Sequence, residues 1–256
     1  ILNVKLKNER LEYYMNFDNR YVYIILAIIV LASVMGGGFD LLSILFTIPG
    51  VLLAITFHEY AHAIVAYKLG DDTPKVQGRL SLNPFTHLDP IAVVLLVFTH
   101  IGWGRPVEIN PNNFNKKISA KTGEAIVAVA GPIMNFLLAI VLTIILYALQ
   151  IFATNFVNIS RIGIIIFTML QYAVIVNVGL GVFNLIPLPP LDGSKVLMAF
   201  LPYNAKRWFE NHERTFYIIF LIIWITPIAG EIVSPIISAV SYGISSMVLN
   251  LFSIFM

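Results

Sequence analysis

Residues 41–67 read LLSILFTIPGVLLAITFHEYAHAIVAY, an apolar run long enough to cross a bilayer. His58 and His62 are four residues apart, so a helix places both imidazoles on one face, close enough to bind one metal ion. Glu59 projects beside them, where its carboxylate can take a proton from metal-bound water. Packed histidines without a function are the alternative, but ionisable groups that face lipid cost about 2.5 kcal/mol each or more. The pattern predicts a zinc hydrolase that works within a membrane, with one Zn²⁺ per chain.

The composition independently indicates an integral membrane protein. Hydrophobic residues make up 58% of the 256 residues and charged residues 12%, against about 25% charged residues in an ordinary globular domain. The net charge is +2 and the basic residues are spread over several loops, which argues against a nucleic-acid partner. The sequence has no cysteine, which excludes disulfides, thiolate metal ligands and cysteine nucleophiles.

We expect an all-α polytopic membrane protein with about six transmembrane helices, built as a single integral membrane domain over residues 1–256. The apolar stretch 91–98 is too short to span, so we expect a short re-entrant or β-like segment near 91–104, within the loop region 68–120. The predicted spans are 21–36, 41–67, 124–153, 162–186, 215–229 and 232–256, with a proline-rich, Asp-bearing loop that extends the fourth to residue 201.

The distribution of basic residues predicts the orientation of these spans. If the chain threads alternately through six spans, Arg161 stands alone on one side, and the other 15 of the 16 Lys and Arg residues lie opposite it. Basic residues collect on the cytoplasmic side of membrane proteins. We therefore expect a multi-pass protein of the cell membrane with its active site toward the cytoplasm.

A catalytic zinc ion held by two histidines needs a third protein ligand and keeps its fourth position open. Asp192 is the best candidate, because alternate threading brings it to the same membrane depth as the two histidines. Three prolines within 187–190 prevent a regular helix before it, and irregular backbone at membrane depth is tolerated only where it lines a cavity. An Asp-Gly turn, or an N-cap for a helix over 194–201, is the alternative role.

Motifs spread from about residue 41 to residue 201 resemble the site-2 protease family, the intramembrane zinc metalloproteases, and in particular a compact bacterial branch of it. The two metal motifs carry most of this resemblance, and the segments between them add to it. The matching segments are HEYAH (58–62), GRLSLNP (78–84), HLDP (87–90), GWGRPV (102–107), AGPIMN (130–135) and NLIPLPPLDG (184–193).

The resemblance implies roles for individual residues. His58, His62 and Asp192 would be zinc ligands, Glu59 the general base, and Asn184 a residue near the substrate. Asn184 could donate a hydrogen bond to the substrate or to a developing oxyanion, whereas a capping or loop-bracing asparagine is the alternative. Some members carry a PDZ or CBS domain; the soluble stretches here are too short for a domain of about 100 residues, so we expect neither.

For some other polar residues the sequence allows two different roles. His87 and Asp89 could support the active site or lie in a surface turn. Asn135 could support the active site or join two helices by hydrogen bonds. We expect a structural or interfacial role for His100 and a solvated surface helix around His212.

The expected activity is hydrolysis of peptide bonds in membrane-spanning peptides or proteins, near the cytoplasmic side of the bilayer. Regulated intramembrane proteolysis and clearance of signal-peptide remnants both fit such an enzyme. A zinc transporter is one alternative, but it needs a ladder of polar residues through the membrane. A non-catalytic membrane scaffold that retains a metal is the other, and a scaffold has no need of Glu59.

Overall fold

The structure is a computed structural model that describes residues 41–88, 104–225 and 227–253. Residues 42–88 and 104–256 form one compact unit. The predicted first span (21–36), most of the predicted segment 91–104, and the residues Asp89 and His100 lie outside the described residues.

Four helices in the described part of the chain are long and apolar enough to cross a membrane. They are α3 (Leu41–Lys68), α6 (Ala120–Phe152), α8 (Arg161–Asn184) and α12 (Pro227–Ser253). The shortest of them, α8, has 24 residues, and at about 1.5 Å per residue it exceeds the roughly 30 Å of a hydrocarbon core. The prediction of a helical, multi-pass membrane protein is confirmed at this level, whereas the count of six spans stays a prediction.

Shorter elements connect these helices. They are α4 (Thr73–Val76), the 3₁₀ helices η1 (Pro84–Thr86) and η2 (Pro111–Asn113), α7 (Thr154–Ile159), α9 (Asp192–Phe200), α10 (Tyr203–Asn211) and α11 (Glu213–Ile225). The described ranges contain no β-strand. Within them, extended backbone pairs only at an isolated antiparallel bridge between Leu88 and Gly104.

Several predicted boundaries are wrong. The third span begins at Ala120 and not at 124, because the side chain of Ser119 accepts a hydrogen bond from the Thr122 N–H and caps the helix there. The fourth span ends at Asn184, before the proline-rich loop, and not at 186. In the described residues α11 ends at Ile225 and α12 starts at Pro227, not at 229 and 232, so α11 has 13 residues, fewer than the about 20 that a span requires.

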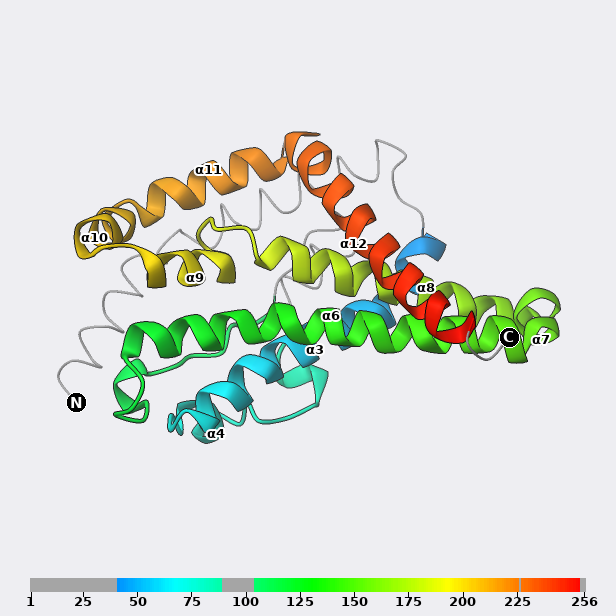
Figure 1. Ribbon diagram of the computed structural model, residues 1–256, viewed down its shortest axis with the longest axis horizontal. Helices are drawn as coiled ribbons and strands as arrows, with labels where there is room; N and C mark the ends of the chain where they lie inside the picture. Colours follow the sequence, from blue (N-terminus) through cyan, green and yellow to red (C-terminus); the bar gives the residue numbers. More distant parts are fainter. Residues whose placement is uncertain (1–40, 89–103, 226, 254–256) are drawn as a thin grey trace. The chain divides into compact units, whose positions relative to one another are not determined.

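The helix α6 lies against α8, α9 and α12 (Figure 1). Small and branched side chains from α6, α8 and α12 form the buried core between them, with Ala139, Val178 and Val248 fully covered. Helix α3 approaches α8 closely, because a Cβ on Gly50 would lie only 2.6 Å from the Ala173 Cα. This packing brings one face of α3 next to the middle of α8, and Ala54 of α3 accepts a hydrogen bond from α6.

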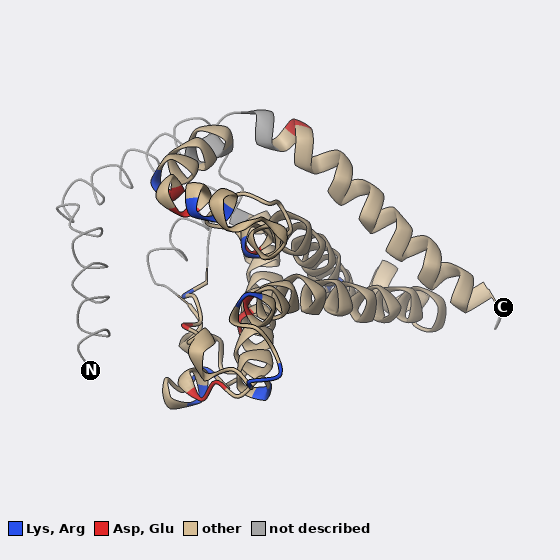
Figure 2. Ribbon diagram, turned by 60° about the vertical axis from the view of Figure 1, so that its left-hand side comes forward, with Lys and Arg blue, Asp and Glu red and all other residues tan. Residues whose placement is uncertain are grey.

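Charged residues gather around the start of α6 and around α4, α9 and α10 (Figure 2). Lys121 lies in the first turn of α6, and its amine donates a hydrogen bond to the Leu201 carbonyl between α9 and α10. Lys206 of α10 lies 4.0 Å from a carboxylate oxygen of Glu124 in α6. The polar end of this bundle is therefore the end at which α6 starts and α9 finishes.

Candidate metal centre

His58 and His62 lie on one face of α3, one turn apart, and both are buried. Their rings stand nearly perpendicular at 84°, with centroids 4.6 Å apart, and the two Nε2 atoms are separated by 3.0 Å. The i, i+4 spacing thus puts two nitrogen lone pairs at one point, as the sequence pattern predicts.

Asp192 reaches the same point from the far end of the proline-rich loop. It is the first residue of α9 and its side chain is 12% exposed, with Oδ2 at 3.1 Å from the Nε2 of both His58 and His62. Gly193 permits this approach, because a Cβ there would clash with the Leu185 and Ile186 carbonyls. The N-cap of α9 is Leu191, and the Asp192 carboxylate faces the histidines, so the N-cap alternative for Asp192 is wrong.

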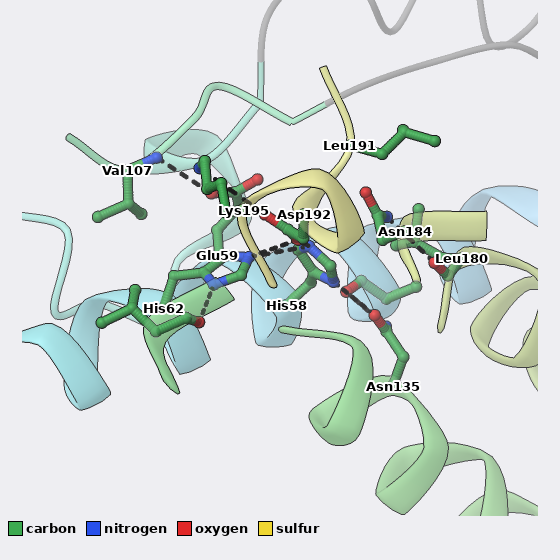
Figure 3. Close-up of polar contacts among 12 residues, drawn as sticks. His58, Glu59, His62, Val107, Asn135, Leu180, Asn184, Leu191, Asp192 and Lys195 are labelled. Carbon is green, nitrogen blue, oxygen red and sulfur yellow. Dashed lines mark hydrogen bonds and ion pairs between the residues drawn. The ribbon is translucent and has the colours of Figure 1, made fainter. Parts of the chain in front are cut away.

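Hydrogen bonds orient both imidazole rings (Figure 3). The Nδ1 of His58 lies 2.6 Å from Asn135 Oδ1, and the Nδ1 of His62 lies 2.7 Å from the Val127 carbonyl oxygen. Both acceptors are carbonyl oxygens that cannot donate, so each Nδ1 carries a proton, and in the neutral ring Nε2 then keeps its lone pair. This is the arrangement that a histidine metal ligand needs.

The three converging atoms fit a tetrahedral zinc ion. Their separations are 3.0, 3.1 and 3.1 Å, and zinc bonds of about 2.0–2.2 Å require ligand atoms roughly 3.3–3.5 Å apart. Two imidazoles and one carboxylate form a donor set found in catalytic zinc sites. Gly131 of α6 provides room, because a Cβ at this position would lie 2.5 Å from His62 Nε2 and 2.6 Å from His58 Nε2. His58, His62 and Asp192 could therefore hold one metal ion.

Glu59 is buried beside this group but is not one of its three converging members. Its Oε2 accepts a hydrogen bond of 3.2 Å from the main-chain N–H of Val107. Gly104 lies against the same carboxylate, because a Cβ there would be 2.8 Å from Oε1. The extended segment 104–107 thus packs against the glutamate and fixes one of its oxygens.

Asn184 is the last residue of α8, near Asp192 and Leu191 in Figure 3. Its Nδ2 donates a hydrogen bond of 3.0 Å to the Leu180 carbonyl, one turn earlier in the same helix. The Nδ2 group has a second hydrogen, which Asn184 could donate to a substrate without giving up this bond.

Two further buried residues hold the loops between α3 and α6. His87 is fully buried, so the surface-turn alternative is wrong: its Nε2–H donates to the Ser81 carbonyl at 2.7 Å, and its own carbonyl accepts from the Arg105 N–H at 2.6 Å. Asp71, also buried, accepts hydrogen bonds from Thr73, Asn110 and Asn113. Burial alone would raise the pKa of Asp71, but these hydrogen bonds lower it below its ordinary value.

Several groups at the site were not predicted from the sequence. Asn177 of α8 hydrogen-bonds to Asn135, and it carries the same signal that marks Asn135, an amide within an apolar span. The Val127 carbonyl and the Val107 N–H are main-chain groups, so no residue type could have revealed them. His212, expected on a surface helix, is exposed at the junction of α10 and α11.

Comparisons with known proteins agree with this geometry. Residues 46–227 match the model of "Peptidase family M50". The chain is 35% identical over 189 residues to "Putative zinc metalloprotease YwhC" of Bacillus subtilis, across 74% of this chain and 84% of that protein. It is 27% identical over 186 residues to "Putative zinc metalloprotease Rip2" of Mycolicibacterium smegmatis, across 70% of this chain and 66% of the relative. "Zinc metalloprotease MJ0392" of Methanocaldococcus jannaschii is 28% identical over 151 residues, across 59% of this chain and 33% of that protein. No solved structure matches the chain.

Proposed function

This chain belongs to peptidase family M50 and is a membrane metalloprotease with a zinc cofactor, and from this premise we propose that it hydrolyses peptide bonds of membrane-spanning substrates. We propose His58, His62 and Asp192 as the zinc ligands and Glu59 as the general base. The observation that carries the proposal is the convergence of two Nε2 atoms and one carboxylate oxygen within 3.1 Å of one another, with a fourth ionisable group beside them.

Each residue has a distinct task in the proposed hydrolysis. Zinc, when bound, supplies Lewis acidity, which would lower the pKa of a bound water to about 7 and polarise a carbonyl. Glu59 takes the proton from the attacking water as the oxygen–carbon bond forms, and delivers it to the amide nitrogen as the carbon–nitrogen bond breaks. The Val107 N–H holds one oxygen of Glu59, so the carboxylate is oriented before the substrate arrives.

The site favours a substrate in extended form. A membrane-spanning helix protects its peptide bonds by internal hydrogen bonding, so the substrate must unwind locally, near glycine, proline or another weak helix former. We propose Asn184 as the residue that contacts this unwound segment, because it ends α8 and lies near Leu191 and Asp192 (Figure 3). One amide hydrogen of Asn184 would stay with the Leu180 carbonyl, and the other would donate to the substrate.

We propose that cleavage takes place in the cytoplasmic half of the bilayer. His58 precedes the end of α3 at Lys68 by ten residues, which at about 1.5 Å per residue is roughly 15 Å of helix. The charged residues of the described ranges collect around that end (Figure 2), and basic residues favour the cytoplasmic side. The proposed localisation is the cell membrane, with the site open toward the cytoplasm.

The test is cleavage of a single-span model substrate by the purified chain in lipid nanodiscs, with the cut mapped by mass spectrometry. We expect a zinc-dependent cut in the cytoplasmic half of the substrate span. Glu59→Gln should keep stoichiometric zinc and lose nearly all cleavage, whereas His58→Ala should lose both. Glu231→Gln, which changes an exposed glutamate of α12, serves as the matched control and should stay active.

The outcomes separate the alternatives. A fully active Glu59→Gln variant would refute the assignment of the base. Zinc binding without cleavage would favour a scaffold, and zinc flux into sealed vesicles would favour a transporter. A cut in the outer third of the bilayer would overturn the proposed orientation.

A further inference from the structure

Two asparagine side chains are fully buried where α3, α6 and α8 meet. Asn135 belongs to α6 and Asn177 to α8, and each is 0% exposed. Burial of an amide group costs free energy unless the group is hydrogen-bonded, so the hydrogen-bond partners of both side chains indicate what these residues do.

The two amides form a directed chain that ends at a proposed zinc ligand. Asn177 Nδ2 donates to the Ala173 carbonyl at 2.8 Å, which turns its Oδ1 toward Asn135. Asn135 Nδ2 donates to this Oδ1 at 3.1 Å and to the Ala54 carbonyl of α3 at 3.1 Å. Asn135 Oδ1 then accepts from His58 Nδ1 at 2.6 Å.

We propose that Asn177 is a positioning residue, which acts through Asn135 to select the protonation site of His58. The oxygen and nitrogen of an amide are nearly equal in size, so Asn135 alone could adopt either of two flipped orientations. A main-chain carbonyl can only accept, so Ala173 fixes the direction of Asn177, and Asn177 together with Ala54 fixes the direction of Asn135.

The direction of this chain decides whether His58 can bind a metal. With Oδ1 of Asn135 facing it, Nδ1 of His58 is the protonated nitrogen and Nε2 faces His62 and Asp192 with its lone pair. With the amide reversed, an NH₂ group would face Nδ1 and favour a proton on Nε2, where it blocks coordination. Loss of such outer hydrogen bonds lowers metal affinity by about 10- to 100-fold. The inference rests on the proposed ligand set.

The first experiment compares zinc affinities by chelator competition on the full-length chain. Asn177→Leu removes the acceptor for Asn135, so we expect zinc to bind about 10- to 100-fold more weakly. Asn177→Asp keeps an oxygen opposite Asn135 Nδ2 and should recover most of that loss. Thr143→Val is the control, because Thr143 of α6 is buried and its hydroxyl donates to the Ala139 carbonyl without any link to His58. This control should leave zinc affinity unchanged.

A double-mutant cycle tests whether Asn177 acts through Asn135. In an Asn135→Leu background, Asn177→Leu should change zinc affinity no further, since the intermediate group is already absent. Additive losses would overturn the proposal. Equal zinc affinity in the wild type and in Asn177→Leu would overturn it as well. A wild type that binds no zinc would instead refute the ligand set.

A second measurement needs no substitution of Asn177 or Asn135. Nitrogen NMR of histidine-labelled, zinc-free protein distinguishes the two neutral tautomers, and the His58 signals are assigned from their loss in His58→Ala. We expect His58 to carry its proton on Nδ1. A neutral ring with its proton on Nε2 would overturn the proposal even if the leucine variants fail to fold.

Discussion

Substitution of Gly131 by alanine is predicted to weaken zinc binding without unfolding the chain. The new Cβ would lie 2.5 Å from His62 Nε2 and 2.6 Å from His58 Nε2 and Cε1, whereas ordinary contacts begin near 3.4 Å. The difference of about 0.9 Å must be absorbed by rings that are pinned through Nδ1 at 2.6 and 2.7 Å. Metal–ligand distances tolerate only about 0.2 Å, so the rings cannot move and still coordinate as before.

The size of the effect follows from the hydrogen bonds at stake. Displacement of both rings weakens two buried hydrogen bonds worth about 0.5–1.5 kcal/mol each, or about 1–3 kcal/mol together. At 1.4 kcal/mol for each factor of ten, zinc should bind roughly 5- to 150-fold more weakly. Chelator competition measures this affinity, and a melting curve of the zinc-free protein reports the fold.

The matched control is Gly243→Ala in α12, where a Cβ would meet nothing within 4 Å. Zinc affinity should be unchanged in this variant, and alanine should stabilise the helix slightly. Wild-type zinc affinity in Gly131→Ala would show that α6 does not approach the ligand nitrogens as closely as the structure has it, and the reasoning about the site would fail.

Three further predictions concern carboxylates in and near the site. Asp192→Asn should weaken zinc binding and cleavage together, because a neutral amide replaces the charged oxygen of the proposed ligand; metal analysis that finds full zinc occupancy would contradict this. Gly104→Ala should keep zinc but lower cleavage by about 10- to 100-fold, since a Cβ 2.8 Å from Glu59 Oε1 displaces the base. Asp71→Asn should cost about 1–3 kcal/mol of stability, because its new NH₂ group would face the N–H that now donates to Oδ2, whereas the exposed neighbour Asp72→Asn should cost little. Folding lowers the pKa of Asp71, so its contribution to stability is complete above about pH 4 and is lost as the pH falls through the pKa of the folded state. The difference in melting temperature between the wild type and Asp71→Asn should therefore shrink as the pH is lowered.

Features that depend on neighbours in sequence could be predicted from the sequence. The i, i+4 spacing of His58 and His62 sets a shared helix face, and the hydropathy of 41–67 sets a span, because both follow from the geometry of one helix. The prolines of 187–190 likewise force α8 to end before Asp192. The predicted start of α6 and the predicted end of α11 are wrong by several positions. Each boundary depends on a single residue, the Ser119 cap of α6 and Pro227 at the start of α12.

Only the tertiary structure decides how the site is oriented. The acceptors for the two imidazoles are Asn135 and the Val127 carbonyl of α6, which meet α3 only because the helices pack at these turns. The room at Gly131 and the contact of Val107 with Glu59 are also distances between segments remote in sequence. A pattern of residue types specifies which groups can bind a metal, since that is a property of each side chain. Which nitrogen faces the metal is a property of the partner across the helix interface, and it is determined when the helices assemble.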